Sequence, residues 1–525
     1  MAKQKQKILF FFLFIFSVYC ALTIGQTWDE GAELLKGKIT LDYLFSLGEI
    51  DNKTLYRENY SPIYWSLLYF LTKIFPAQYQ IEVSHLINSL LSLGTIFAIR
   101  KLSQELFNYK VGNLVFLILF FYPIFFGHMA INYKDMVLAF SHVWIAYLML
   151  RYLKKHNTKE NTNRYVIFIG ILAAISTGIQ LVFLGSLIPI FLFILFEIFF
   201  FKNFTNKNFN KRIFFYDLAK CFIIFYSLLI LFWIDVYPNI FLLPFNIFME
   251  TLSPDYWTGW PYNIINGDYY LSKEVPKTYL LINFIYKSPE YFLFTYLFFI
   301  ILIFTSKKFF KKRFKFFSYK LFFIISILVF PNLVLIFIPY PVYDGMRLFL
   351  WSLPYFCIIP AITIYYLIEN FNFIKSKLTL SFLIIFIIYF IFNFLSITPY
   401  HYTYLNIFNG KIENRYQKFE NDYWGSTIKE LVKKTKFNKN ETIAIATCGV
   451  SNTISKNYFK KKGYYNLRFV SYKNADYIIM TNRAILKDEK TKDDYKLTNC
   501  FDRFKGDDVF KVERNGLLLS VIRKI

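Results

Sequence analysis

Repeated apolar runs, each close to the thickness of a lipid bilayer, constrain this chain more than any other feature of its sequence. A helix needs about 20 mostly apolar residues to cross the hydrocarbon core, and about eleven stretches qualify. They cover residues 8–25, 81–99, 111–128, 136–150, 164–181, 183–201, 216–235, 289–306, 319–339, 346–368 and 377–397. Hydrophobic residues make up 56% of the 525 positions, too many for ordinary soluble domains. The sequence predicts a polytopic α-helical membrane protein.

The distribution of positive charge predicts which side of the membrane each loop faces. The net charge of +25 could suggest nucleic acid as a partner, but the basic residues gather in short breaks between apolar runs. With the N-terminus inside, the cytoplasmic breaks hold Arg100, Lys101, Arg151, Lys154, Lys155, Lys211, Arg212 and the run 307–315. Lys134 and Arg347 are the only lysine or arginine residues of the two short outer loops. This asymmetry indicates a positive-inside topology and no nucleic-acid partner.

Four loops and the end of the chain then lie on the outer side. The loops are two long and two short ones, at residues 26–80, 236–288, 128–135 and 340–347. Residues 399–525 follow the last apolar run, and their basic character does not prevent export, because long domains translocate largely regardless of charge. The chain therefore divides into a membrane domain, residues 1–398, and a soluble domain, residues 399–525.

The soluble domain has the pattern of a small α/β fold. Thr442–Thr447 and Ala475–Met480 are strand-like, and a polar helical stretch lies between them. Asn515-Gly516 separates two further strand-like segments and is a typical two-residue hairpin turn.

The five cysteines show no close metal-binding spacing. Cys20, Cys221 and Cys357 lie in or beside apolar runs. Cys448 and Cys500 share the soluble domain and can pair if that domain faces an oxidising compartment.

Polar and charged residues gather in the predicted outer segments. Asp29 and Glu30 follow the first apolar run within a few residues, a place that suits a catalytic base but is also typical of a solvated loop. The other outer candidates are His128, Asn132, Lys134, Asp135, Trp257, Trp260, Tyr343, Asp344 and Arg347.

These residue types together suit sugar transfer from a lipid phosphate. A carboxylate can take a proton from an acceptor hydroxyl. Lysine or arginine neutralises a phosphate leaving group, and aromatic rings stack on sugars or anchor at the interface. Structural roles stay open beside these: Lys134 can pair with Asp135, Arg347 can anchor the interface, and the tryptophans can be belt residues.

The order of motifs resembles a known family. The motif DE follows the first predicted span, and the motif FFGHxxxNxKD follows the third. YDGMR lies between two later spans, and the motifs PYxYxYxN and DYWG follow the last span. Together they resemble bacterial dolichyl-phosphate-mannose–protein mannosyltransferase-like enzymes of glycosyltransferase family 39, in the GT-C superfamily. The resemblance covers roughly residues 20–430 and includes His85 and Asn88. The chain departs from the family at Leu348, where histidine is common, and at Gln180, where arginine is common.

The resemblance implies a hexosyl- or pentosyltransferase of GT-C fold in a bacterial inner membrane, with a polyprenyl-phosphate sugar as donor. It implies a periplasmic active site and transfer to an acceptor hydroxyl on protein, lipid or glycan, by displacement with inversion. Asp29 matches the family's catalytic base and Asp135 its second acidic position, with Glu30 as a third acid. Lys134 and Arg347 are the expected phosphate ligands. The expected substrate-binding residues are His128, Asn132, Tyr343, Asp344, Trp257 and Trp260. These residues establish no cofactor, and a divalent metal near the carboxylates stays an open alternative.

Two other functions compete with this reading. A transporter or flippase of lipid-linked sugars keeps ionisable groups at mid-membrane. Here the predicted spans are nearly free of them, since Glu197 lies near a cytoplasmic end, and Glu82 and Asp235 lie at outer ends. The second alternative is a non-catalytic scaffold with a periplasmic domain, in which other residues could replace Asp29 and Glu30 without loss of function.

Overall fold

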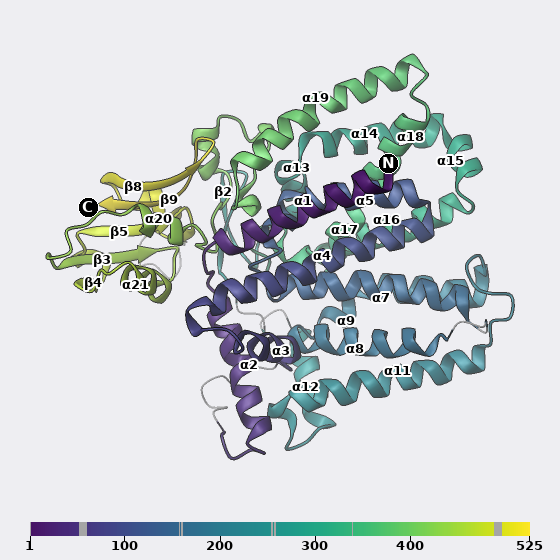
Figure 1. Cartoon of the computed structure of the whole chain (residues 1–525), viewed down its shortest axis with the longest axis horizontal. Coiled ribbons are helices and arrows are strands. Elements are labelled where there is room, and N and C mark those ends of the chain that lie inside the picture. The colour runs from purple at the N-terminus through teal and green to yellow at the C-terminus, as the bar shows by residue number, and fades with distance from the viewer. Residues whose placement is uncertain are drawn as a thin grey trace.

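The computed structural model is a bundle of helices with a smaller α/β unit at one end (Figure 1). It describes residues 2–51, 60–156, 158, 161–253, 256, 259–338, 340–487 and 496–525. The helices before the α/β unit are α1 Ala2–Thr23, α2 Glu30–Phe45, α3 Ile63–Thr72, α4 Gln80–Leu106, α5 Tyr109–Phe120, α6 Pro123–His128, α7 Asp135–Lys155, α8 Asn163–Ile179, α9 Phe183–Ser186, α10 Ile188–Phe196, α11 Lys211–Phe232, α12 Leu242–Thr251, α13 Tyr279–Lys287, α14 Glu290–Thr305, α15 Lys307–Arg313, α16 Phe317–Phe337, α17 Leu353–Phe356, α18 Ile358–Glu369 and α19 Ile374–Ser396.

Within the described residues, five helices are long and apolar enough to cross a membrane. They are α4 with the 3-10 turn before it, α7, α11, α16 and α19, and the pair α13–α14, bent by 116°, would make a sixth. Each predicted apolar run is mainly helical, but several of these helices are shorter than a full span. The run 183–201, for example, is divided among α9, α10 and the π-helix Glu197–Phe201. The chain thus has the helices of a membrane protein, while the number of eleven spans stays a prediction.

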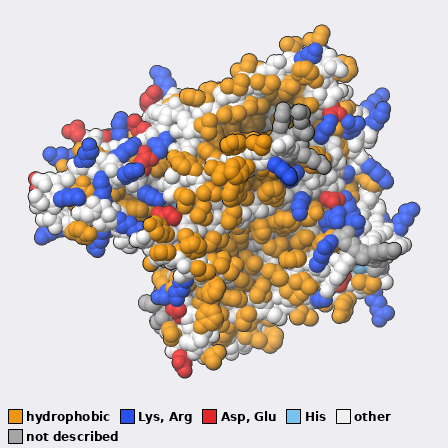
Figure 2. Space-filling model, viewed as in Figure 1, with side chains coloured by type: hydrophobic (Ala, Val, Ile, Leu, Met, Phe, Trp, Pro, Cys, Tyr) orange, Lys and Arg blue, Asp and Glu red, His pale blue; other side chains and the backbone are white. Residues whose placement is uncertain are grey.

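Apolar side chains cover the flank of the bundle that Figure 2 shows. On α19, for example, Leu378, Ile385, Ile388 and Phe392 are each exposed by 63–67%. Lysines and arginines are visible instead on the α/β unit and at the opposite end of the bundle. The basic helix α15 lies at that opposite end (Figure 1), as the predicted topology requires.

The α/β unit confirms the strands that the sequence predicted. Its strands and helices are α20 Ile428–Lys434, β3 Ile443–Cys448, α21 Asn452–Lys461, β4 Leu467–Phe469, β5 Tyr477–Thr481, β6 Ala484–Leu486, β7 Leu497–Asn499, α22 Cys500–Arg503, β8 Asp507–Arg514 and β9 Leu517–Lys524. In its described part, a five-stranded sheet has the order β4-β3-β5-β9-β8, and β6 pairs with β7. β3 runs parallel to both neighbours, whereas β9 is antiparallel to β5 and β8.

The hairpin between β8 and β9 turns at the predicted residues. Asn515 and Gly516 have φ values of 50° and 83°. Both angles are positive, as a two-residue hairpin turn of the type that favours Asn-Gly requires. Cys448 and Cys500 form a disulfide with a Cα–Cα distance of 5.9 Å.

One hydrophobic cluster joins the α/β unit to the bundle. It includes Ala21 and Ile24 at the end of α1, Ile131 after α6, and Ile445 and Leu519 in the sheet. The backbone N–H of Gly25 donates to the Ser426 carbonyl at 3.2 Å, and a Cβ at Gly25 would lie 2.3 Å from that oxygen.

A second close approach lies at α6, which packs on the 3-10 turn His401–Thr403. A Cβ at Gly127 would lie 2.1 Å from the backbone nitrogen of Tyr402. The segment after the third predicted run and the segment after the last one are therefore held together, although they are far apart in the sequence. A small hairpin of β1 Tyr262–Ile265 with β2 Asp268–Leu271 lies in the long loop 236–288, which the sequence predicts to face outward.

Candidate active site

The YDGMR motif forms a tight turn that presents Arg347 at the bundle end near the α/β unit. Asp344 and Gly345 have φ values of 59° and 65°. Aspartate and glycine tolerate this left-handed conformation better than most residues, so the local sequence suits the turn. Arg347 then begins a short 3-10 helix, Arg347–Phe349.

Arg347 brings together carboxylates from three separate segments. It donates from Nη2 to Asp29 Oδ2 at 3.0 Å, from Nε to Asp135 Oδ2 at 3.1 Å, and from Nη1 to Asp344 Oδ2 at 2.8 Å. Asp29 precedes α2, Asp135 begins α7, and Asp344 lies in the turn itself. Here Asp29, Asp135, Asp344 and Arg347 are called the Arg347 cluster. Four of the predicted site residues thus meet at one point.

The members of the Arg347 cluster differ in exposure. The side chains of Arg347, Asp135 and Asp344 are 7%, 2% and 1% exposed, whereas that of Asp29 is 45% exposed. Buried charges need partners, so the three buried members depend on each other. Asp29 can instead exchange its ion pair for a contact with a molecule from solution.

Aromatic rings enclose the guanidinium of Arg347. Its Cζ lies 4.3 Å from the centroid of Trp424 and 5.7 Å from that of Tyr343. Burial alone would lower the pKa of Arg347, but Asp29 and Asp135 hold it well above its ordinary value. The cation is therefore permanent, and it is partly shielded from water.

Asn132 orients the second acidic residue. Its side-chain amide donates to Asp135 Oδ2 at 2.9 Å, and its oxygen accepts from the backbone N–H groups of Asp135 at 2.8 Å and Lys134 at 3.2 Å. His128 is buried, and its Nε2 lies 2.8 Å from the hydroxyl of Tyr423. Both residues, predicted to bind substrate, have contacts within the protein that hold the site in place.

Lys134 lies beside the Arg347 cluster without joining it. Its ammonium is 5.5 Å from the ring centroid of Tyr60, and it makes no ion pair with any described residue. Burial lowers its pKa, but Tyr60 and Asp135 raise it by more, so the pKa lies above its usual range. Lys134 is thus a charged, half-buried cation that can take an anionic ligand.

The structure does not bring Glu30 to the Arg347 cluster. Its carboxylate is fully buried, accepts from Thr27 Oγ1 at 2.8 Å, and lies 3.1 Å from His85 Nε2. His85 Nδ1 is 3.0 Å from the Ala21 carbonyl oxygen. Glu30 and His85, here called the Glu30 pair, fasten the start of α2 to α4 and to the end of α1.

Glu33 is an acid near the Arg347 cluster for which no sequence motif predicts a role. It follows Asp29 by one helical turn, and its backbone N–H donates to the Asp29 carbonyl at 3.0 Å. Burial, and then the charge of Asp29, raise the pKa of its carboxyl to about 8. Glu33 is therefore mainly protonated at neutral pH.

The two predicted tryptophans have different outcomes. Trp257 lies outside the described residues. Trp260 donates from Nε1 to the Ala484 carbonyl at 3.1 Å, and its ring centroid is 6.4 Å from that of Trp28. Tyr343 packs on the backbone beside Trp260, since a Cβ at Gly259 would lie 2.2 Å from the Tyr343 ring.

Arg483 of the α/β unit is a site residue that sequence reasoning missed. Its Nη1 donates to Asp344 Oδ1 at 2.5 Å, and its Nε lies 3.7 Å from Glu420 Oε1. Burial raises the pKa of Glu420 to about 7, although Arg483 opposes the shift. Nothing in the sequence around Arg483 distinguishes it from the other arginines of the chain. Only its tertiary contact with Asp344 places it beside the Arg347 cluster.

A divalent metal at the carboxylates stays a prediction from the sequence. In the described ranges of the chain, no group of three or more His, Cys, Asp or Glu side chains is arranged to hold a metal ion. The carboxylates of the Arg347 cluster surround a guanidinium instead.

Comparison with known proteins supports the fold. No protein-family model matches the chain, and no curated protein matches it in sequence. The crystal structure of ArnT from Cupriavidus metallidurans in the apo state is similar over 99% of this chain and 98% of its own, with 12% identity and a TM-score of 0.51. The chain therefore shares the fold of that ArnT structure.

Two further structures are similar at lower scores. ArnT from the same organism bound to undecaprenyl phosphate matches with 10% identity and a TM-score of 0.46, over 99% of this chain and 98% of its own. The apo oligosaccharyltransferase of Archaeoglobus fulgidus matches with 10% identity and a TM-score of 0.45, over 89% of this chain and 69% of its own.

Proposed function

We propose that this chain is an integral membrane glycosyltransferase that uses a polyprenyl-phosphate sugar as donor. The observation that carries the proposal is the Arg347 cluster, in which outer segments bring one exposed and two buried carboxylates to a buried arginine. The proposed enzyme lies in a bacterial inner membrane with about eleven spans. The Arg347 cluster and the α/β unit face the periplasm, because the lysine and arginine distribution favours this orientation.

Asp29 is the proposed general base. Its side chain is 45% exposed and stands at the start of α2, where a water-borne acceptor can reach it. The Glu30 pair anchors the next residue to α4, so the position of Asp29 is fixed although its carboxylate is accessible. A carboxylate held in this way can accept the proton of an attacking hydroxyl.

Arg347 and Lys134 are the proposed ligands of the donor phosphate. Asp135 and Asp344 keep Nε and Nη1 of Arg347 occupied, so a phosphate oxygen would replace Asp29 at Nη2. This exchange frees Asp29 to act as a base at the moment when donor is bound. The ammonium of Lys134 supplies a second positive charge for the departing phosphate.

The reaction is then a single displacement. The acceptor oxygen forms a bond to the anomeric carbon, and its proton passes to Asp29. The bond from that carbon to the phosphate oxygen breaks with its electron pair on the phosphate, whose charge Arg347 and Lys134 stabilise. Attack from the face opposite the leaving group inverts the anomeric configuration.

ArnT, whose fold the chain shares, has been crystallised with undecaprenyl phosphate, a lipid of the kind that the proposed transfer would release. The acceptor is a hydroxyl on protein, lipid or glycan. Arg347 and Lys134 can neutralise the departing phosphate without a metal, so we expect EDTA to leave turnover unchanged. Stimulation of turnover by Mg²⁺ or Mn²⁺ after chelation would instead add a divalent cation to the proposed site.

The direct test is transfer of labelled sugar from a panel of polyprenyl-phosphate donors by the protein purified in detergent. Release of free polyprenyl phosphate that depends on an acceptor supports the enzyme. A flippase would move intact donor across vesicles without breaking the glycosidic bond. Glu49→Gln is a matched control, because Glu49 is an exposed carboxylate after α2 and lies outside the site.

The orientation has its own test. Single cysteines at the exposed Phe45 and Tyr465 should react with an impermeant maleimide in intact spheroplasts. A cysteine at Lys308 of α15 should react only after permeabilisation. The opposite pattern would place the site in the cytoplasm.

A further inference from the structure

Asp344 lies between two buried arginines. Its Oδ2 accepts from Arg347 Nη1 at 2.8 Å, and its Oδ1 accepts from Arg483 Nη1 at 2.5 Å. The side chains of Arg483 and Asp344 are 6% and 1% exposed. Both oxygens of the carboxylate are therefore committed, and Asp344 joins the guanidinium of the bundle to a guanidinium of the α/β unit.

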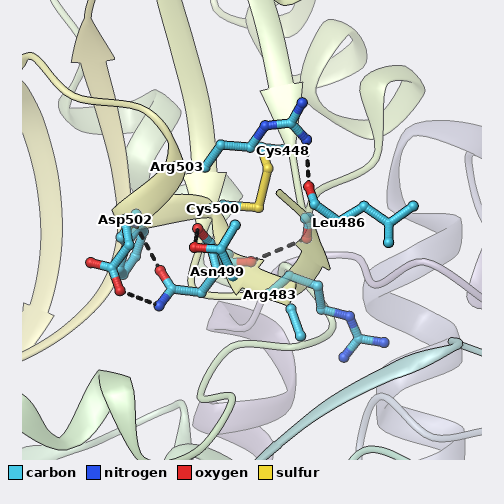
Figure 3. Close-up of a disulfide and its surroundings, with 12 residues drawn as sticks. Cys448, Arg483, Leu486, Asn499, Cys500, Asp502 and Arg503 are labelled. Carbon is cyan, nitrogen blue, oxygen red and sulfur yellow. Dashed lines mark hydrogen bonds between the residues drawn. A yellow bond between two sulfur atoms is a disulfide. The ribbon is translucent and has the colours of Figure 1, made fainter. Parts of the chain in front are cut away.

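The backbone at Arg483 is held by the disulfide region. The N–H of Cys500 donates to the Arg483 carbonyl at 3.0 Å, and Cys500 is bonded to Cys448. A Cβ at Gly449 would lie 2.5 Å from the Cβ of Arg483, so the glycine makes room for this approach. Figure 3 shows the Arg483 side chain pointing away from the disulfide, while Arg503 extends in a different direction.

Neighbours of Arg483 bind the segment that leads from the last helix of the bundle. Asn482 Nδ2 donates to the Phe419 carbonyl at 2.8 Å, and Asn482 Oδ1 accepts from Asn421 N–H at 2.9 Å. The N–H of Ala484 donates to Glu420 Oε1 at 2.9 Å. The residues on both sides of Arg483 are thus fixed to residues 419–421.

The guanidinium of Arg483 also lies on an aromatic ring. Its Cζ is 4.5 Å from the Trp260 ring centroid, and Trp260 donates from Nε1 to the Ala484 carbonyl. This ring and Asp344 fix the guanidinium from two directions. Loss of Arg483 would leave Asp344 Oδ1 buried without that partner, and a buried unpaired carboxylate oxygen favours rearrangement.

We propose that Arg483 is a positioning residue, contributed by the α/β unit, which fixes Arg347 through Asp344 for contact with the donor phosphate. The α/β unit is then part of the active site rather than an appended module. This inference rests on the proposed function, in which Arg347 binds the donor phosphate.

Kinetics of Arg483→Ala, Arg483→Lys and the control Arg503→Ala test the proposal. Arg503 lies beside the same disulfide and donates to the Leu486 carbonyl at 2.9 Å, away from the Arg347 cluster. We expect Arg483→Ala to lower kcat/KM for the donor by about 100-fold, because small misplacements of a catalytic group have effects of this size. The KM for the acceptor should stay unchanged. Arg483→Lys should recover about tenfold, since lysine keeps the charge but loses the planar fork, and Arg503→Ala should match wild type.

A second measurement separates this inference from the proposed reaction. Phenylglyoxal modification, mapped by mass spectrometry, reports the accessibility of Arg347 without any substrate. We expect Arg347 to be protected in wild type and in Arg503→Ala, and to react several times faster in Arg483→Ala. Faster labelling together with absent transferase activity in wild type would support the positioning role and reject the proposed function. Unchanged labelling with wild-type donor kinetics in Arg483→Ala would overturn the inference.

Discussion

The Arg347 cluster and the Glu30 pair begin at adjacent residues, yet they are different kinds of site. Asp29 faces Arg347 with nearly half of its side chain exposed, whereas Glu30 is fully buried against His85. Ala21 O can only accept, so His85 Nδ1 carries a proton, and Nε2 faces both oxygens of Glu30 at 3.1 Å. The first arrangement can exchange partners with a substrate, and the second is closed on itself.

An acidic motif does not by itself identify a catalytic base. Both carboxylates lie at the start of α2, where the helix dipole favours negative charge. What separates them is access to solvent and the type of partner. An exposed carboxylate on a buried arginine is suited to proton transfer, while a sealed carboxylate–histidine pair is suited to holding helices together.

Asp29→Asn should impair sugar transfer more than any other substitution proposed for these two sites. The amide keeps the shape and cannot accept the proton, so turnover should fall by about 100-fold or more. Folding should survive, since the side chain is half-exposed. The measurement is single-turnover sugar transfer with the enzyme in excess over labelled donor and with saturating acceptor. Wild-type turnover in Asp29→Asn would remove the distinction between the two sites and make Asp135 the next candidate for the base.

Glu30→Gln should affect stability more than chemistry. The substitution weakens a buried contact with His85, which should cost about 1–3 kcal/mol of unfolding free energy. Thermal unfolding in detergent measures this loss, and turnover per folded molecule should fall far less than in Asp29→Asn. If Glu30→Gln keeps its melting temperature and loses turnover as completely as Asp29→Asn, then Glu30 belongs to the chemistry.

Arg347→Lys should give a smaller kinetic effect. Lysine keeps a positive charge but cannot bind Asp135, Asp344 and a phosphate at once, so donor kcat/KM should fall about tenfold. Arg347→Ala should be worse, because it leaves buried carboxylates unpaired. A titration of donor at saturating acceptor distinguishes the two variants. Equal, near-wild-type values for both would remove Arg347 from the donor site.

The smallest effect concerns Glu33, which lies one turn beyond Asp29. Its folded-state pKa of about 8 is above the ordinary value of 4.5, so the folded protein holds a proton that the unfolded chain releases. Stability from this group is full below about pH 4.5 and is lost as the pH rises toward 8. Melting temperatures between pH 5 and 8 should therefore decline less in Glu33→Gln than in wild type. Identical slopes would show that Glu33 does not carry the proton.

Features that depend on nearby residues could be predicted from the sequence. The apolar runs are mainly helical. The predicted strands Thr442–Thr447 and Ala475–Met480 agree with β3 and β5 to within two residues at each end. Asn515-Gly516 turns the β8–β9 hairpin because these two residues accept positive φ values. The YDGMR turn also depends on local sequence, because Asp344 and Gly345 accept positive φ values. The resemblance in motifs also predicted Asp29, Asp135 and Arg347 as site residues, although no local pattern predicts that they contact one another.

Composition, periodicity and turn preference act over a few residues, so they were enough to predict the helical membrane architecture and the small α/β fold. The resemblance in motifs indicated residues that could carry chemistry, but the partners of those residues depend on tertiary packing. Asp29 and Arg347 are 318 positions apart, and Arg483 and Asp344 are 139 apart. Packing of helix ends and the docked sheet set those contacts, and burial then separated Asp29, which can meet a substrate, from Glu30, which cannot.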